Sequence, residues 1–110
     1  MNWQLLASTD DERFYRGAVF RFPAKYPFED TVDFMIIEDT HSSIGLKLIC
    51  STGYHAGQTE LVLPAESKHK DGGLSVQWLI ENWEKWVYPK CSMKEVRFVE
   101  NYWPEIGEIT

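Results

Sequence analysis

The longest amphipathic segment of the chain runs from residue 74 to residue 89. Its apolar residues recur at helical spacing, about 100° per residue, and share one stripe. Ser75 suits the N-cap because its hydroxyl can accept a hydrogen bond from a free amide of the first turn. Pro89 cannot continue a helix and biases Tyr88 out of the helical region, so the predicted helix spans about thirteen residues. The predicted core stripe consists of Val76, Leu79, Ile80, Trp83, Trp86 and Val87.

Trp78 lies off this stripe, in a row with Asn82 and Lys85 on another side of the helix. A large apolar side chain in that position requires cover. Two explanations fit the sequence: the aromatic tail Tyr102-Trp103-Pro104 packs over Trp78, or a partner protein does.

Five other segments alternate apolar and polar residues with the two-residue period of a β-strand. Four precede the helix and one follows it. Because the connections between consecutive strands are too short for helical crossovers, the sheet should be mostly antiparallel, with the long helix packed on one face. The pattern predicts a two-layer α+β fold in a single domain covering residues 1–110. The expected strands are 14–22, 31–38, 44–52, 58–63 and 95–99.

The net charge of the chain limits the kinds of molecule that it can bind. Seventeen acidic against eleven basic residues give a formal net charge of −6, and the basic residues are scattered along the chain. Such a surface repels a phosphate backbone, so we expect no nucleic-acid binding. The acidic residues concentrate in the first forty positions, which suits a basic partner, although ordinary solubilisation is the favoured explanation of the charge taken alone. These residues are Asp10-Asp11-Glu12, Glu29-Asp30, Asp33 and Glu38-Asp39.

The sequence contains no strong catalytic or metal-binding motif. The three histidines fall in predicted loops without the spacing that presents two ligands from one rigid element. Cys50 and His55 could be written as a nucleophile and a base, but Cys50 shares a strand face with Leu46 and Leu48, and core packing explains it better. We therefore expect no enzyme, no metal and no cofactor. The histidines are His41, His55 and His69.

The N-terminal residues lack the basic region and apolar stretch of a signal peptide, and the longest apolar run is Phe34-Met35-Ile36-Ile37. No membrane span is expected from so short a run. The two cysteines, Cys50 and Cys91, form no CxxC unit, and a buried reduced thiol is expected for Cys50. These features favour a cytoplasmic location for the protein.

An ordered series of short motifs resembles the immunity protein 45 family of bacterial polymorphic-toxin systems, over residues 16–99. The helix motif WLIENWEKWVYPKC is the longest piece, and no departure from the family pattern is evident. The motifs are RGAVFRFP (16–23), PFED (27–30), GLKL (45–48), TGYHAG (52–57) and the helix motif (78–91).

The resemblance implies a small antidote without catalytic activity. It would bind the toxic C-terminal domain of a cognate effector, as a monomer in a 1:1 complex, and so protect the producing cell. Toxins of this kind include nucleases and ADP-ribosyltransferases, and the sequence does not choose between them. An acidic protein could occlude a basic active-site cleft, and opposite charge would speed the encounter.

The candidate contacts with the toxin combine acidic residues and aromatic anchors. Each has a competing structural role; Tyr54, for example, lies in a glycine-flanked turn and could equally cap the end of the sheet. The acidic candidates are Glu29, Asp30, Asp33, Glu38 and Asp39, and the aromatic candidates are Tyr54, Trp78 and Trp103.

Two other functions stay open from sequence alone. The first is a small enzyme or ligand-binding domain with a pocket near Cys50, His55 and Asp39, which a deep pocket holding a perturbed titratable group would favour. The second is an adaptor that associates with itself through the helix and Trp78.

Overall fold

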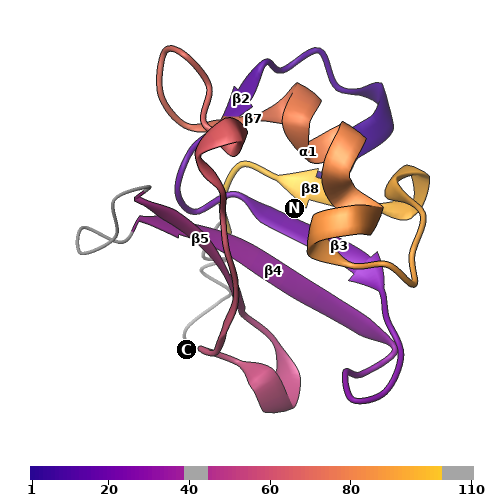
Figure 1. Ribbon diagram of the computed structural model, residues 1–110. Helices are drawn as coiled ribbons and strands as arrows, with labels where there is room; N and C mark the ends of the chain where they lie inside the picture. Colours follow the sequence, from indigo (N-terminus) through magenta and orange to yellow (C-terminus); the bar gives the residue numbers. More distant parts are fainter. Residues whose placement is uncertain (39–44, 103–110) are drawn as a thin grey trace, which may run out of the picture.

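A six-stranded antiparallel sheet forms one layer of the protein (Figure 1). The computed structural model describes residues 1–38 and 45–102. Two strands that are far apart in the sequence, β3 and β8, pair within the sheet, and the hairpins β3–β4 and β4–β5 extend it on one side. In spatial order the strands are β1 (Gln4–Leu5), β8 (Arg97–Val99), β3 (Val19–Pro23), β4 (Thr31–Glu38), β5 (Leu46–Cys50) and β6 (Thr59–Val62).

A 12-residue helix crosses one face of this sheet. It comprises α1 (Val76–Asn82) and a π-helical turn, η4 (Trp83–Val87). The Ser75 hydroxyl accepts a hydrogen bond from the Trp78 amide at 3.2 Å, as predicted for the N-cap. At the other end the Tyr88 amide donates to the Trp83 carbonyl at 2.9 Å, and the helix stops before Pro89. The predicted α+β class and the limits of the helix are confirmed.

The prediction that Trp86 belongs to the core is wrong, because its side chain is 42% exposed. A π turn contains more residues than an α turn, since its hydrogen bonds join residues i and i+5. Residues beyond Trp83 are therefore rotated away from the stripe that the α-helical period predicts. Trp86 instead stacks on Trp78, with ring centroids 6.0 Å apart.

The Trp86 ring and the core provide the cover that Trp78 requires, since Trp78 is half-buried and packs against the core. Tyr102 does not provide it: its hydroxyl is bonded to Asp33, on the sheet face away from the helix. Trp103 and Pro104 lie outside the described residues.

Aromatic rings fill the space between helix and sheet. Trp83 is fully buried and meets Phe22 and Phe20 edge-on, at centroid distances of 5.0 and 6.1 Å. Phe22 meets Phe34 of the neighbouring strand at 4.9 Å, again edge-on. These phenylalanines alternate with Arg21 and Asp33, so the two-residue period directs the rings towards the helix and the charges towards the opposite face.

The predicted strand 14–22 is interrupted in the structure. Phe14 belongs to β2 (Arg13–Phe14), which pairs with β7 (Leu74–Ser75) in a separate two-stranded ribbon. A turn follows, in which the Ala18 amide donates to the Tyr15 carbonyl and Gly17 has a φ of 90°. Apolar alternation continues through this turn, and for that reason the sequence did not reveal the break. The strand predicted at 31–38 is present over its whole length, and those at 58–63 and 95–99 are present with shorter ends.

Replacing Trp83 with alanine should lower the free energy of unfolding by about 3–5 kcal/mol, as large aromatic truncations in cores do. Trp86→Ala is the matched control, because the same atoms are removed from a side chain that is 42% exposed. Chemical denaturation of both variants measures the difference. Equal loss in the two variants would contradict this account of the core.

Candidate partner-binding surface

Two loops meet at one end of the sheet, where β3 turns into β4 (residues 24–30) and β5 turns into β6 (residues 51–58). The second loop contains a short 3-10 helix, η2 (Gly53–His55). Two contacts join the loops: the Tyr54 amide donates to Glu29 Oε1 at 2.7 Å, and the rings of Phe28 and His55 stack at 4.8 Å. We call this region the loop-end surface; it consists of Tyr26, Glu29, Asp30, Tyr54 and His55.

Two tyrosines project from the loop-end surface. Tyr26 is 90% exposed and Tyr54 is 89% exposed. Tyr26 was not a candidate from sequence, although its place in the proline-bounded loop 23–27 is a signal that could have indicated it.

The base beneath the two tyrosines is fixed by hydrogen bonds and packing. The Lys25 amide donates to the Tyr88 hydroxyl at 2.9 Å, the Phe28 amide donates to the Lys25 carbonyl at 2.9 Å, and Phe28 packs on Phe34. Rigid aromatic side chains of this kind lose little entropy on binding.

The Glu29 carboxylate depends on the backbone around it. The hydrogen bond from the Tyr54 amide is the main cause that lowers the pKa of Glu29 below its usual 4.5, and its own backbone amide adds to the effect. Gly53 permits this approach: its φ is +66°, and a Cβ atom there would lie 2.0 Å from Glu29 Oε1. The glycine and the carboxylate therefore form one unit that orients Tyr54.

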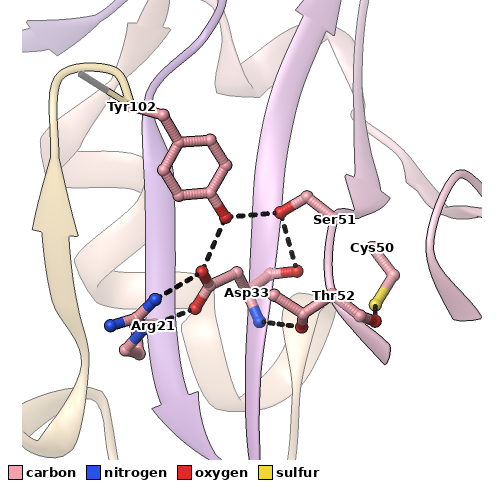
Figure 2. A network of polar contacts seen from close by, with 6 residues as sticks. All are labelled: Arg21, Asp33, Cys50, Ser51, Thr52 and Tyr102. Atoms are coloured by element: carbon pink, nitrogen blue, oxygen red, sulfur yellow. Dashed lines mark hydrogen bonds and ion pairs between the residues drawn. The ribbon is translucent and has the colours of Figure 1, made fainter. Parts of the chain in front are cut away.

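Asp33 is not part of this surface (Figure 2). It is 1% exposed, and the Arg21 guanidinium donates to both carboxylate oxygens at 2.8 and 2.9 Å. The Tyr102 hydroxyl donates to Oδ2 at 2.6 Å, and the Trp3 ring lies 4.0 Å from the Arg21 guanidinium carbon. With its carboxylate enclosed by its own chain, Asp33 presents nothing to a partner in this structure.

Backbone and side-chain contacts complete the Asp33 network. Thr52 Oγ1 accepts a hydrogen bond from the Asp33 amide at 3.0 Å. Ser51 Oγ lies 2.9 Å from the Tyr102 hydroxyl and 3.3 Å from the Asp33 carbonyl, so its single proton can go to either.

Burial and the bond to Asp33 raise the pKa of Tyr102 to about 12. The same carboxylate raises the pKa of Arg21 through their hydrogen bonds. The network holds Trp3 and Tyr102 on the sheet face away from the helix.

The remaining sequence candidates lie elsewhere. Glu38 is at the far end of β4, where it pairs with Arg16 at 3.3 Å, and both side chains are exposed. Such exposed pairs contribute little to stability. Trp78 lies on the helix beside Trp86. Asp39 and Trp103 lie outside the described residues. Of the predicted contacts that the structure describes, only Glu29, Asp30 and Tyr54 are brought together.

The Cys50 and His55 pair does not form a nucleophilic site. Cys50 is fully buried, its Sγ donates to the Thr52 carbonyl at 3.2 Å, and burial raises the pKa of its thiol, which disfavours the reactive thiolate. Cys91 is also buried, and burial raises its pKa to about 11. Both thiols are free, as expected for Cys50.

Metal-ligating side chains do not gather within residues 1–38 and 45–102, where no cluster of three or more of them occurs. No helix in that part of the chain has the length and apolarity that a membrane crossing requires.

The described residues thus form an antiparallel sheet covered by one helix, with two exposed tyrosines on loops at one end of the sheet. Comparison with known proteins identifies the class as an immunity protein. The profile of the family described as Immunity protein 45 matches residues 6–98, and the chain therefore belongs to that family. No curated protein and no solved structure matches the chain.

Gly53→Ala should separate Glu29 from Tyr54, because the added Cβ occupies the place of Oε1. Gly57→Ala is the matched control: its φ is +88° and a Cβ there meets nothing within 4 Å, so it adds only backbone strain, about 1–2 kcal/mol. We expect the Gly53 variant to be the less stable of the two and to shift the Tyr54 amide resonance. Identical stability and unchanged resonances would show that the Glu29 contact is unimportant.

Removing the Tyr102 hydroxyl tests the Asp33 network. Tyr102→Phe should lower the free energy of unfolding at neutral pH by about 1–3 kcal/mol, because a buried acceptor loses its donor. The folded-state pKa of about 12 exceeds the usual 10.0, so this stabilisation is complete below pH 10 and is lost as the pH rises towards 12. Denaturation measured at rising pH should show this loss in the natural chain and not in Tyr102→Phe.

Proposed function

We propose that this protein binds and neutralises the C-terminal toxin domain of a cognate bacterial effector, and so protects the cell that produces it. The family match over residues 6–98 carries the proposal. The protein would act in the cytoplasm by direct 1:1 binding, without a catalytic step. The buried, unactivated thiol of Cys50 supports inhibition by binding rather than by chemistry.

We infer that the loop-end surface contacts the toxin. Tyrosine is enriched among the residues that dominate binding energy, and Tyr26 and Tyr54 offer two such rings on a fixed base. Asp30 is exposed and supplies negative charge beside them, while Glu29, whose Oε2 is buried, holds the turn that carries Tyr54 through its Oε1. A toxin that holds a nucleic acid or a dinucleotide needs a basic cleft, and carboxylates placed over that cleft would steer association and exclude the substrate.

Co-expression with the toxin domain encoded beside this gene tests the function. Cell survival together with co-purification of a stable complex is the expected result. Survival without a complex would indicate that the damage is reversed enzymatically, and death of the cells would refute the immunity function for that toxin.

The loop-end surface is tested by the double variant Asp30→Asn, Tyr54→Ala. Its affinity for the toxin and its association rate are measured at low and moderate salt. The affinity should fall at least about tenfold, since central tyrosines commonly contribute more than 1 kcal/mol. Loss of the charge should also weaken the salt dependence of association. Tyr15→Ala is the control, because Tyr15 is 55% exposed and lies near the opposite end of β4. If the double variant binds the toxin as tightly as Tyr15→Ala does, the interface lies elsewhere.

A further inference from the structure

A cleft of about 520 Å³ lies between the helix and the N-terminal segment that precedes β2. Its volume falls within the range of ligand-binding clefts, roughly 300–1,000 Å³. Three parts of the chain line it: the segment 9–12, the loop at His69 and Lys70, and the first two turns of the helix. The lining segments adjoin the β2–β7 ribbon, which lies at the opposite end of the molecule from the loops of the loop-end surface (Figure 1).

The lining combines negative charge with an apolar portion. Asp11, Glu12 and Glu81 are exposed and contribute three carboxylates, against one ammonium group from Lys70. Ile80, which is partly exposed, supplies most of the apolar portion, because Val76 is only 3% exposed. Carboxylates alone would form an ordinary solvated patch, but here they border a concave site with an aliphatic lining.

The walls of the cleft are held in place by local hydrogen bonds. The Val76 amide donates to the Glu12 carbonyl at 3.0 Å, which fixes the N-terminal segment against the start of the helix. The Gln77 side chain donates to Glu81 Oε1 at 3.2 Å. The cleft is therefore formed before any ligand arrives, which lowers the entropic cost of binding.

His69 lines one side of the cleft, and the Nε2 edge of its ring faces Glu12. The Asp71 amide donates to His69 Nδ1 at 3.1 Å, so the proton of the neutral ring lies on Nε2. That nitrogen is 3.9 Å from Glu12 Oε2, too far for a hydrogen bond. The Glu12 side chain is 84% exposed and keeps its carboxylate available to a ligand.

We propose that this cleft receives a lysine or arginine side chain of the toxin domain. The aliphatic stem of such a residue packs along Ile80, while its cationic head lies between Glu12 and Glu81. Lysine and arginine are the protein side chains that combine an apolar stem with a positive head, as this lining requires. The inference rests on the proposed function and adds a second contact that is separate from the loop-end surface.

The test is calorimetry with a catalytically inactive toxin domain and the double variant Glu12→Gln, Glu81→Gln. Both substitutions keep the side-chain size, and the amide oxygen introduced at position 81 can still accept the hydrogen bond from Gln77. Affinity should fall at least about tenfold, and the loss should shrink at high salt. The matched control is Glu66→Gln with Glu84→Gln, which removes the same charge from exposed positions outside the cleft and should leave the affinity unchanged.

Glu81→Lys gives an independent check, because its own ammonium group would occupy the cleft and repel the incoming cation. It should weaken binding more than Glu81→Gln while the melting temperature stays close to that of the natural chain. If the natural chain and the control bind but both cleft variants bind equally well, the cleft inference is overturned and the proposed function stands. If the natural chain and the control both fail to bind, the proposed function falls and the cleft inference with it.

Discussion

The burial of Trp83 against the phenylalanines of β3 holds the two layers of the protein together. Its ring fixes the helix over the sheet, and the π turn that begins at Trp83 then directs Tyr88 onto Phe22, at a centroid distance of 5.1 Å. The Tyr88 hydroxyl holds the Lys25 amide, and its ring lies 6.1 Å from that of Phe28. A continuous line of aromatic contacts thus runs from the core to the loops that present the exposed tyrosines.

The opposite face of the sheet is organised by charge. Burying the Asp33 carboxylate costs desolvation energy, and the cost is offset only when nearly all of its acceptors find donors. Arg21 and Tyr102 donate to this carboxylate, Thr52 accepts from the Asp33 amide, and the Trp3 ring lies over the partly exposed Arg21 guanidinium. The matched family range, 6–98, contains the ion pair but neither of the terminal aromatic residues that cover it.

The two surfaces proposed to contact the toxin differ in their chemistry. The loop-end surface offers exposed aromatic area beside Asp30, whereas the helix cleft offers a concave site bordered by exposed carboxylates. Aromatic area contributes mostly to the lifetime of a complex, and charge contributes mostly to the encounter rate and to the choice of partner. An inhibitor that must recognise one toxin among relatives would use both.

The helix, its N-cap, the antiparallel order of β3, β4 and β5, and the family could all be predicted from the sequence, because each follows from the periodicity or the local chemistry of one segment. The enclosure of Asp33, the outward position of Trp86 and the orientation of Tyr54 by Glu29 could not. These three outcomes depend on how the folded chain brings its segments together. Asp33 is 12 positions from Arg21 and 69 from Tyr102, and Glu29 is 25 from Tyr54. The periodicity of a strand shows which face a residue occupies, but whether a charge on that face is solvated, paired or offered to a partner is settled only when distant atoms have folded around it.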